Sequence, residues 1–176
     1  MVTTNKSLQD TLNESLAYDA SPEKYRELLY KANSEDYNDD TQELTTGNLF
    51  HNPPEEEHTS KRIAYGGISW IEYWRRMSGY NDIQLRCTFC GKEVFSDIDS
   101  PQCMNWRIAH PEEWNYRTED DYQAIGGHFY KNGEDNCDGF IIIPICKDCN
   151  TKAETYDLKV IVPNAAVNEI GATVKD

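Results

Sequence analysis

The chain has 176 residues, of which 38% are hydrophobic, and a formal net charge of -14 at pH 7. This excess of acidic side chains argues against nonspecific affinity for nucleic acid, because binding to phosphates depends on Lys and Arg that displace counterions. No apolar run approaches the roughly 18 residues of a membrane span, and the first residues lack the apolar stretch of a secretory signal. We therefore expect an intracellular, cytoplasmic protein with no membrane partner, a setting in which paired cysteines more often bind metal than form disulfides.

The charge is distributed unevenly along the sequence. Residues 1–60 hold 13 acidic and 4 basic side chains and residues 87–176 hold 16 and 8, whereas residues 61–86 hold 2 acidic and 5 basic ones. The basic side chains of this short stretch are Lys61, Arg62, Arg75, Arg76 and Arg86. We interpret them as the solvated face of a helix; as an alternative, they form a basic-aromatic patch with Trp70 and Trp74 that would bind nucleic acid.

The sequence divides into three segments. Residues 1–33 are expected to be a helical N-terminal segment, because leucines repeat at i+4 and Ser21-Pro22-Glu23 is typical of a helix start. Residues 34–60 are rich in acidic residues and contain two adjacent prolines, so we interpret them as an acidic linker that is at least partly disordered. Residues 61–176 are expected to form one zinc-stabilised domain.

The sequence Ser69-Trp70-Ile71-Glu72 predicts the beginning of a helix. The Ser69 hydroxyl and the Glu72 carboxylate lie three residues apart, so that each can bond the other's free backbone N–H. Gly79 is expected to end the helix. Between these signals, four large side chains follow the helical spacing i, i+3, i+4, i+7, namely Trp70, Tyr73, Trp74 and Met77. We expect this stripe to be buried in the core.

Two Cys-x-x-Cys pairs are the strongest signal in the sequence. Each spacing is typical of a zinc knuckle, a tight turn that directs two thiolates at one ion, and Gly91 allows a sharp turn after the first pair. Four thiolates make a closed tetrahedral site of the kind that holds a fold together. We therefore predict one structural Zn²⁺ bound by Cys87, Cys90, Cys146 and Cys149. Two disulfides, or two reduced pairs in the core, are the alternatives.

The 55 residues between the two pairs predict a subdomain rather than a compact finger. Residues 125–130 and 140–145 are expected to form the two strands of a β-hairpin, because turn dipeptides punctuate the loop between them. The second knuckle then begins a short helix over residues 148–155, and a strand over 156–162 follows. The expected fold class is α+β.

The order of knuckle, β-hairpin and knuckle at a helix start resembles the treble-clef zinc finger. Within it, Gly126-Gly127-His128 followed by Cys146-x-x-Cys149-Asn150 resembles the core of an HNH (His-Me finger) nuclease. In that family the first His is the general base on a water, and a divalent ion stabilises the phosphate. The resemblance implies His128 as the base, Asn150 as a metal or orienting residue, and Mg²⁺ or Mn²⁺ besides the structural zinc.

The sequence departs from the active HNH pattern. Gly127 stands where active members usually have Asp or Glu, and residues 140–143 are apolar where the middle Asn usually lies. Residues 87–176 also lack the basic surface expected of a DNA-binding protein. We therefore expect His128 to be a structural hairpin histidine, with a catalytic or zinc-ligand role as the alternatives, and Asn150 to cap or brace the knuckle helix.

Four further residues are potential metal ligands, namely Cys103, His110, Cys137 and His51, of which His51 lies in the expected linker and is interpreted as solvated. Cys103, His110 and Cys137 have no knuckle spacing, so we interpret them as buried or free thiols and a turn histidine. A second metal site made of these three side chains is the alternative.

These patterns support three hypotheses about function. The first is a non-catalytic, zinc-binding, acidic interaction module or inhibitor, whose partner is a protein with a basic surface that otherwise binds nucleic acid. The second is an HNH-type metal-dependent endonuclease that uses His128. The third is a nucleic-acid-binding zinc module that uses the basic stretch 61–86.

Overall fold

The structure is a computed structural model. It describes residues 21–32, 41–51, 62–64, 67–115, 118–131, 140–154, 156–169 and 173–174. Its helices are α2 (Pro22–Ala32), α3 (Trp70–Ser78), α4 (Pro101–Ala109), α5 (Pro111–Asn115), α6 (Glu119–Tyr122) and α7 (Lys147–Lys152). Its strands are β1 (Thr41–Glu43), β2 (Leu49–His51), β3 (Arg62–Ile63), β4 (Gln84–Arg86), β5 (Glu93–Phe95), β6 (Ile125–Lys131), β7 (Ile141–Ile145), β8 (Leu158–Lys159), β9 (Ala165–Asn168) and β10 (Thr173–Val174). The expected helix around Leu8 lies outside the described residues.

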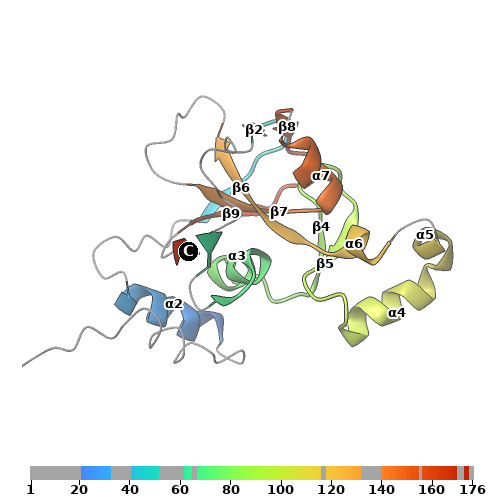
Figure 1. Cartoon of the computed structure of the whole chain (residues 1–176), viewed down its shortest axis with the longest axis horizontal. Helices are drawn as coiled ribbons and strands as arrows, with labels where there is room; N and C mark the ends of the chain where they lie inside the picture. Colours follow the sequence, from blue (N-terminus) through green and yellow to red (C-terminus); the bar gives the residue numbers. More distant parts are fainter. Residues whose placement is uncertain are drawn as a thin grey trace, which may run out of the picture.

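A six-stranded antiparallel sheet forms the centre of the molecule, in the order β1-β9-β7-β6-β2-β8. The predicted hairpin is its middle, with Ile125 opposite Ile145 and Phe129 opposite Ile141. Helix α3 lies on one side of this sheet and α7 on the other (Figure 1). Two smaller sheets, β4-β5 and β3-β10, accompany it. The α+β fold class is thereby confirmed.

Helix α3 begins and ends as the sequence predicts. The Ser69 hydroxyl accepts a bond from the Glu72 backbone N–H, and Gly79 adopts the left-handed conformation at φ 73° that closes many helices. Of the stripe, Tyr73, Trp74 and Met77 are buried and Trp70 is partly buried. Tyr73 donates to the carbonyl of Asn168 at 2.7 Å and Trp74 donates to that of Ala165 at 2.8 Å. The helix is therefore bound to β9 by polar as well as apolar contacts.

Gly126 lets α3 approach the sheet unusually closely. A Cβ atom at this position would lie 2.4 Å from the backbone carbon of Trp70, a distance that real Cβ atoms do not reach. Because Gly126 has no side chain, the first turn of α3 can contact the backbone of β6 directly. Because residues alternate between the two faces of a strand, His128 faces the same side as Gly126.

The segment 34–60, expected to be an acidic linker, contributes two strands to the central sheet. Strand β1 pairs with β9, and β2 lies between β6 and β8. Between and beside the acidic clusters, Leu44 and Phe50 are 2% and 0% exposed. A few apolar residues are enough to bury a short strand. Because the segment is acidic on average, its composition does not reveal these residues.

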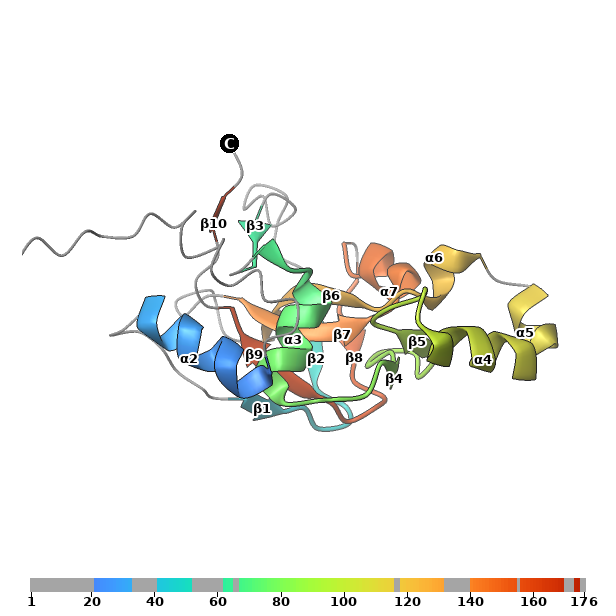
Figure 2. The same cartoon turned by 90° about the horizontal axis from the view of Figure 1, so that it is seen from below.

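Helices α4 and α5 extend away from the central sheet, as Figure 2 shows. Phe95, Cys103 and Tyr122 form a small separate core at the base of this extension. On the outer side of α4, Met104 is 53% exposed and Ile108 76% exposed. None of the helices in the described part of the chain is long and apolar enough to cross a membrane.

Candidate metal centre

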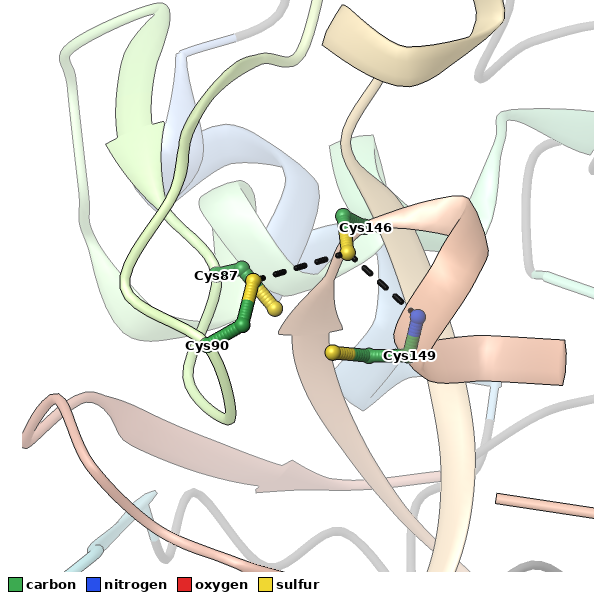
Figure 3. Close-up of side chains that lie close together, drawn as sticks. All are labelled: Cys87, Cys90, Cys146 and Cys149. Atoms are coloured by element: carbon green, nitrogen blue, oxygen red, sulfur yellow. Dashed lines mark hydrogen bonds between the residues drawn. The ribbon is translucent and has the colours of Figure 1, made fainter. Parts of the chain in front are cut away.

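The four predicted cysteines converge in space. The sulfur atoms of Cys87, Cys90, Cys146 and Cys149 all lie within 4.8 Å of one another. Figure 3 shows the two thiols of the first knuckle facing those of the second, which lie at the start of α7. Cys87, Cys146 and Cys149 are buried, whereas Cys90 is exposed at the edge of the cluster. The structure thus forms a single four-sulfur cluster from chain segments far apart in the sequence.

The spacing of the sulfurs is compatible with zinc. A tetrahedral ion with Zn–S bonds of about 2.3 Å places its sulfur ligands about 3.8 Å apart. The sulfurs of Cys90 and Cys146 are separated by 3.8 Å. A disulfide would require about 2.05 Å, and these cysteines are free thiols. Four soft sulfur donors in tetrahedral array suit zinc or iron rather than hard cations such as magnesium.

The first knuckle is a tight turn held by its own backbone. Gly91 donates its N–H to the carbonyl of Cys87 at 2.9 Å, and Cys87 donates to the carbonyl of Lys92 at 2.9 Å. Gly91 has a φ of 75°, in the left-handed region that glycine tolerates best. The turn following Cys90 therefore has the conformation that the Cys-Gly step predicts.

The second knuckle coincides with a helix start. Cys146 is the N-cap of α7, and its sulfur accepts the N–H of Cys149 at 3.4 Å, the bond drawn in Figure 3. A sulfur in this position lies near the positive end of the helix backbone, which favours the thiolate. Hydrogen bonding from the Cys149 thiol lowers the pKa of Cys146 to about 6.

Without a bound ion, the cluster favours a mixture of thiolates and thiols. Hydrogen bonding with Cys146 lowers the pKa of Cys90 far below its usual value. The same shared protons raise the pKa values of Cys87 and Cys149. Four adjacent thiolates would repel one another, so full deprotonation needs a bound cation.

Residues inside the first Cys-x-x-Cys pair anchor it to the sheet. Thr88, fully buried, donates its hydroxyl to the Pro144 carbonyl at 2.8 Å and accepts a bond from the side chain of Asn164 at 2.9 Å. The neighbouring Phe89 packs on Phe129 with ring centroids 5.2 Å apart. None of these contacts could be predicted from the sequence, because the partners come from segments distant along the chain.

An ion pair joins the two knuckles at the surface. Lys92 follows the first pair and its ammonium lies 3.4 Å from a carboxylate oxygen of Asp148, inside the second pair. The Asp148 side chain is 61% exposed, so the pair contributes little to stability on its own.

His128 lies on the face of the sheet that is turned away from α7. Its ring contacts Trp70 of α3 at 4.6 Å and Phe140 at 5.8 Å between ring centroids. Its Nε2 atom lies 2.7 Å from Oε2 of Glu169, with both side chains buried, although the angles fall outside those of a hydrogen bond. The backbone N–H of Glu169 also donates to the carbonyl of Phe140 at 2.9 Å, which links the end of β9 to the residue before β7.

The structure does not bring His128 and Asn150 together. Asn150 belongs to α7, whereas His128 packs on Trp70 of α3, and Figure 1 shows these two helices on opposite sides of the sheet. Its backbone N–H bonds the carbonyl of Cys146 at 3.0 Å within the helix. At Gly127, a Cβ would lie 2.6 Å from both Ile145 and Phe129, so a carboxylate side chain would not fit without moving the core.

The other potential ligands do not gather among the described residues. Cys103 is buried in α4, and this burial raises its pKa. His110 caps the same helix, with Nδ1 2.8 Å from the carbonyl of Trp106 and its ring stacked on the indole. Cys137 lies outside the described residues, so the alternative of a second metal site is left untested.

Three arginines of the basic stretch form ion pairs within the molecule. Arg75 and Arg76 both pair with Glu72, at 2.8 and 3.1 Å. Arg76 is 4% exposed and lies over the ring of Tyr25 on α2. Arg86 pairs with Glu93 at 3.1 Å.

Comparison with known proteins identifies no relative: no protein-family model, no curated protein and no solved structure matches this chain. The description of the site therefore depends on its geometry alone.

Proposed function

We propose that the chain is a non-catalytic interaction module stabilised by one structural zinc ion in a treble-clef arrangement. The observation that carries the proposal is the position of His128. Its ring is enclosed by Trp70 and Phe140 and its Nε2 faces the buried Glu169, on the face of the sheet opposite α7. A general base must reach a water at a phosphate, and the burial of His128, which is 7% exposed, argues against that role.

The nature of the sulfur cluster supports a structural role for the ion. Four protein sulfurs within 4.8 Å of one another are enough to complete the shell of a tetrahedral ion and would leave no position for water or substrate, which is the difference between structural and catalytic zinc sites. The lack of space for a carboxylate at Gly127 adds to this, because the resemblance to HNH nucleases places a ligand of the catalytic ion there. These features favour a metal that holds the fold.

The charge of the chain supports a basic protein as the partner. The net charge of -14 favours association with a positively charged surface and makes it faster. Arg75, Arg76 and Arg86 of the basic stretch pair with carboxylates, which weakens the case for a nucleic-acid-binding patch. A protein surface that normally binds nucleic acid is basic, so this chain would compete with nucleic acid for it.

Two measurements test the proposal. Supercoiled plasmid incubated with the zinc-loaded protein and Mg²⁺ or Mn²⁺ should stay intact, as it should with a His128→Ala variant. Fluorescein-labelled octalysine should bind, with an affinity that falls steeply between about 0.05 and 0.3 M salt, whereas a labelled DNA duplex should not. Nicking that disappears in the variant would establish a nuclease instead, and binding of the duplex alone would establish a nucleic-acid module.

A further inference from the structure

Three open pockets adjoin one another along the β4-β5 hairpin. A pocket of about 610 Å³ at the end of α3 shares Tyr80 and Asn164 with a pocket of about 320 Å³ beside β4. That pocket shares Arg86 and Glu93 with a third, of about 570 Å³, which reaches α4 and α5. Figure 2 shows α3, the β4-β5 hairpin and α4 following one another in this order. We call this run the hairpin groove; the side chains that matter below are Glu43, Tyr80, Asp82, Glu93, Trp106 and Glu113.

The hairpin groove carries an excess of negative charge. Its lining includes four carboxylates and two cations. Both cations are already paired: Arg86 with Glu93 at 3.1 Å, and Lys92 with Asp148 outside the groove. Glu43 and Glu113, near its two ends, are exposed and have no ion-pair partner among the described residues. A positively charged ligand would complement both ends.

Aromatic rings lie beside the carboxylates. Tyr80 is 37% exposed, and Trp106 is partly exposed in the third pocket. Burial and then the charge of Asp82 raise the pKa of Tyr80, while the hydrogen bond from Gln102 lowers the pKa of Asp82. At neutral pH the ring is therefore uncharged and the carboxylate ionised. An aromatic face next to a carboxylate is a favourable site for an ammonium or guanidinium group.

The backbone of β4 offers few bonds to a ligand. The carbonyl of Gln84 accepts the hydroxyl of Tyr80 at 2.8 Å, and the carbonyl of Arg86 accepts the side chain of Asn164 at 3.2 Å. A peptide in the groove would therefore be held by its side chains rather than by joining the hairpin as a third strand.

We propose that the hairpin groove binds an extended peptide segment that carries several Lys or Arg side chains, presented by the basic partner. The proposal rests on the function proposed above and assigns the contact to one surface. The cations of the segment lie between the rings of Tyr80 and Trp106 and the carboxylates along the groove, and Glu43 and Glu113 hold its two ends.

The test compares two variants of equal charge. Glu43→Gln/Glu113→Gln removes two carboxylates from the groove, and Glu154→Gln/Asp157→Asn removes two exposed carboxylates that do not line it. The groove variant should bind labelled octalysine about fivefold more weakly than the unmodified protein, and the control less than about twofold. Tyr80→Leu, which keeps the bulk but removes the ring, should lose about threefold.

Chemical cross-linking identifies the carboxylates that octalysine contacts and tests the site independently of the variants. Carbodiimide joins a lysine amine to a nearby carboxylate with loss of water, so octalysine should be coupled mainly to groove carboxylates in peptides identified by mass spectrometry. If octalysine binds but both double variants weaken it equally, or coupling is spread over the surface, the groove proposal is wrong while the proposed function stands. If octalysine does not bind at all, the proposed function fails and the groove proposal with it.

Discussion

At the scale of single residues, His128 and Glu169 form a buried polar contact between β6 and the end of β9. His128 is 7% exposed and the Glu169 side chain 2% exposed. We predict that His128→Ala destabilises the protein by about 3 kcal/mol, because it leaves a buried carboxyl group without its partner and opens a cavity beside Trp70. Urea unfolding monitored by circular dichroism measures the effect.

The pair can be tested as a unit by a double-mutant cycle. His128→Leu and Glu169→Leu should each be destabilising alone, and the double variant should be more stable than the sum of the two losses predicts, by about 1 kcal/mol or more. Strictly additive losses would contradict the coupling that we infer from the 2.7 Å contact.

The residues described above differ in whether their roles can be predicted from the sequence. The four cysteines were predicted, because their spacing reflects a local geometric requirement of the ion. Glu169 and Thr88 were not, since their roles depend on partners that folding brings from distant segments, the hairpin for Glu169 and the 161–164 segment for Thr88. The identity of a residue does not reveal such a partner.

The docking of the first knuckle onto β7 is a property of whole elements. Thr88 bonds Pro144 and Asn164, and nothing else in the turn is both polar and fully buried. We predict that Thr88→Val lowers the free energy of unfolding by about 1 kcal/mol, because it keeps the shape but removes both hydrogen bonds of the hydroxyl, while the Pro144 carbonyl keeps its bond from the Thr88 N–H and Asn164 its bond to Arg86. Thr151→Val, at an exposed position of α7, is the matched control and should cost less than about 0.5 kcal/mol in the same unfolding measurement.

Elements with strong local signals were predicted well. Helix α3 has the predicted N-cap at Ser69, a largely buried aromatic stripe and a terminal glycine, although the Glu72 carboxylate pairs with Arg75 and Arg76 instead of completing the capping box. Strands β1 and β2 have three residues each and were hidden in what was expected to be a linker. Strands this short form only because neighbouring strands supply their hydrogen bonds, so tertiary context decides them. The strand expected over 156–162 is limited to Leu158–Lys159 for the same reason.

At the scale of the whole molecule, we expect the metal to decide whether the domain folds. Binding of structural zinc is worth roughly 10–16 kcal/mol, comparable with the entire stability of a domain at about 5–15 kcal/mol. The purified protein should contain one zinc ion per chain by elemental analysis. Removing it with a chelator should abolish the near-ultraviolet circular dichroism signal, and adding Zn²⁺ should restore it.

Cysteine variants provide the control for metal loss. Cys90→Ser should reduce zinc content and thermal stability although the residue is exposed, because it removes one of the four ligands. Cys103→Ala, outside the cluster, should keep one zinc per chain. A chelated protein with an unchanged fold would contradict a structural role for the ion.

The strand order also has a consequence for how the chain is made. Among the described strands, β1 pairs with β9, and β2 pairs with β6 and β8. Strands near the N-terminus therefore cannot pair until segments much later in the sequence have been synthesised. At about 5–20 residues per second, a ribosome needs on the order of ten seconds between releasing β1 and releasing β9. During that interval the first knuckle also lacks the cysteines of the second. The nascent chain thus spends its synthesis with exposed strands and free thiols, and depends on chaperones more than a domain whose neighbours in space are neighbours in sequence.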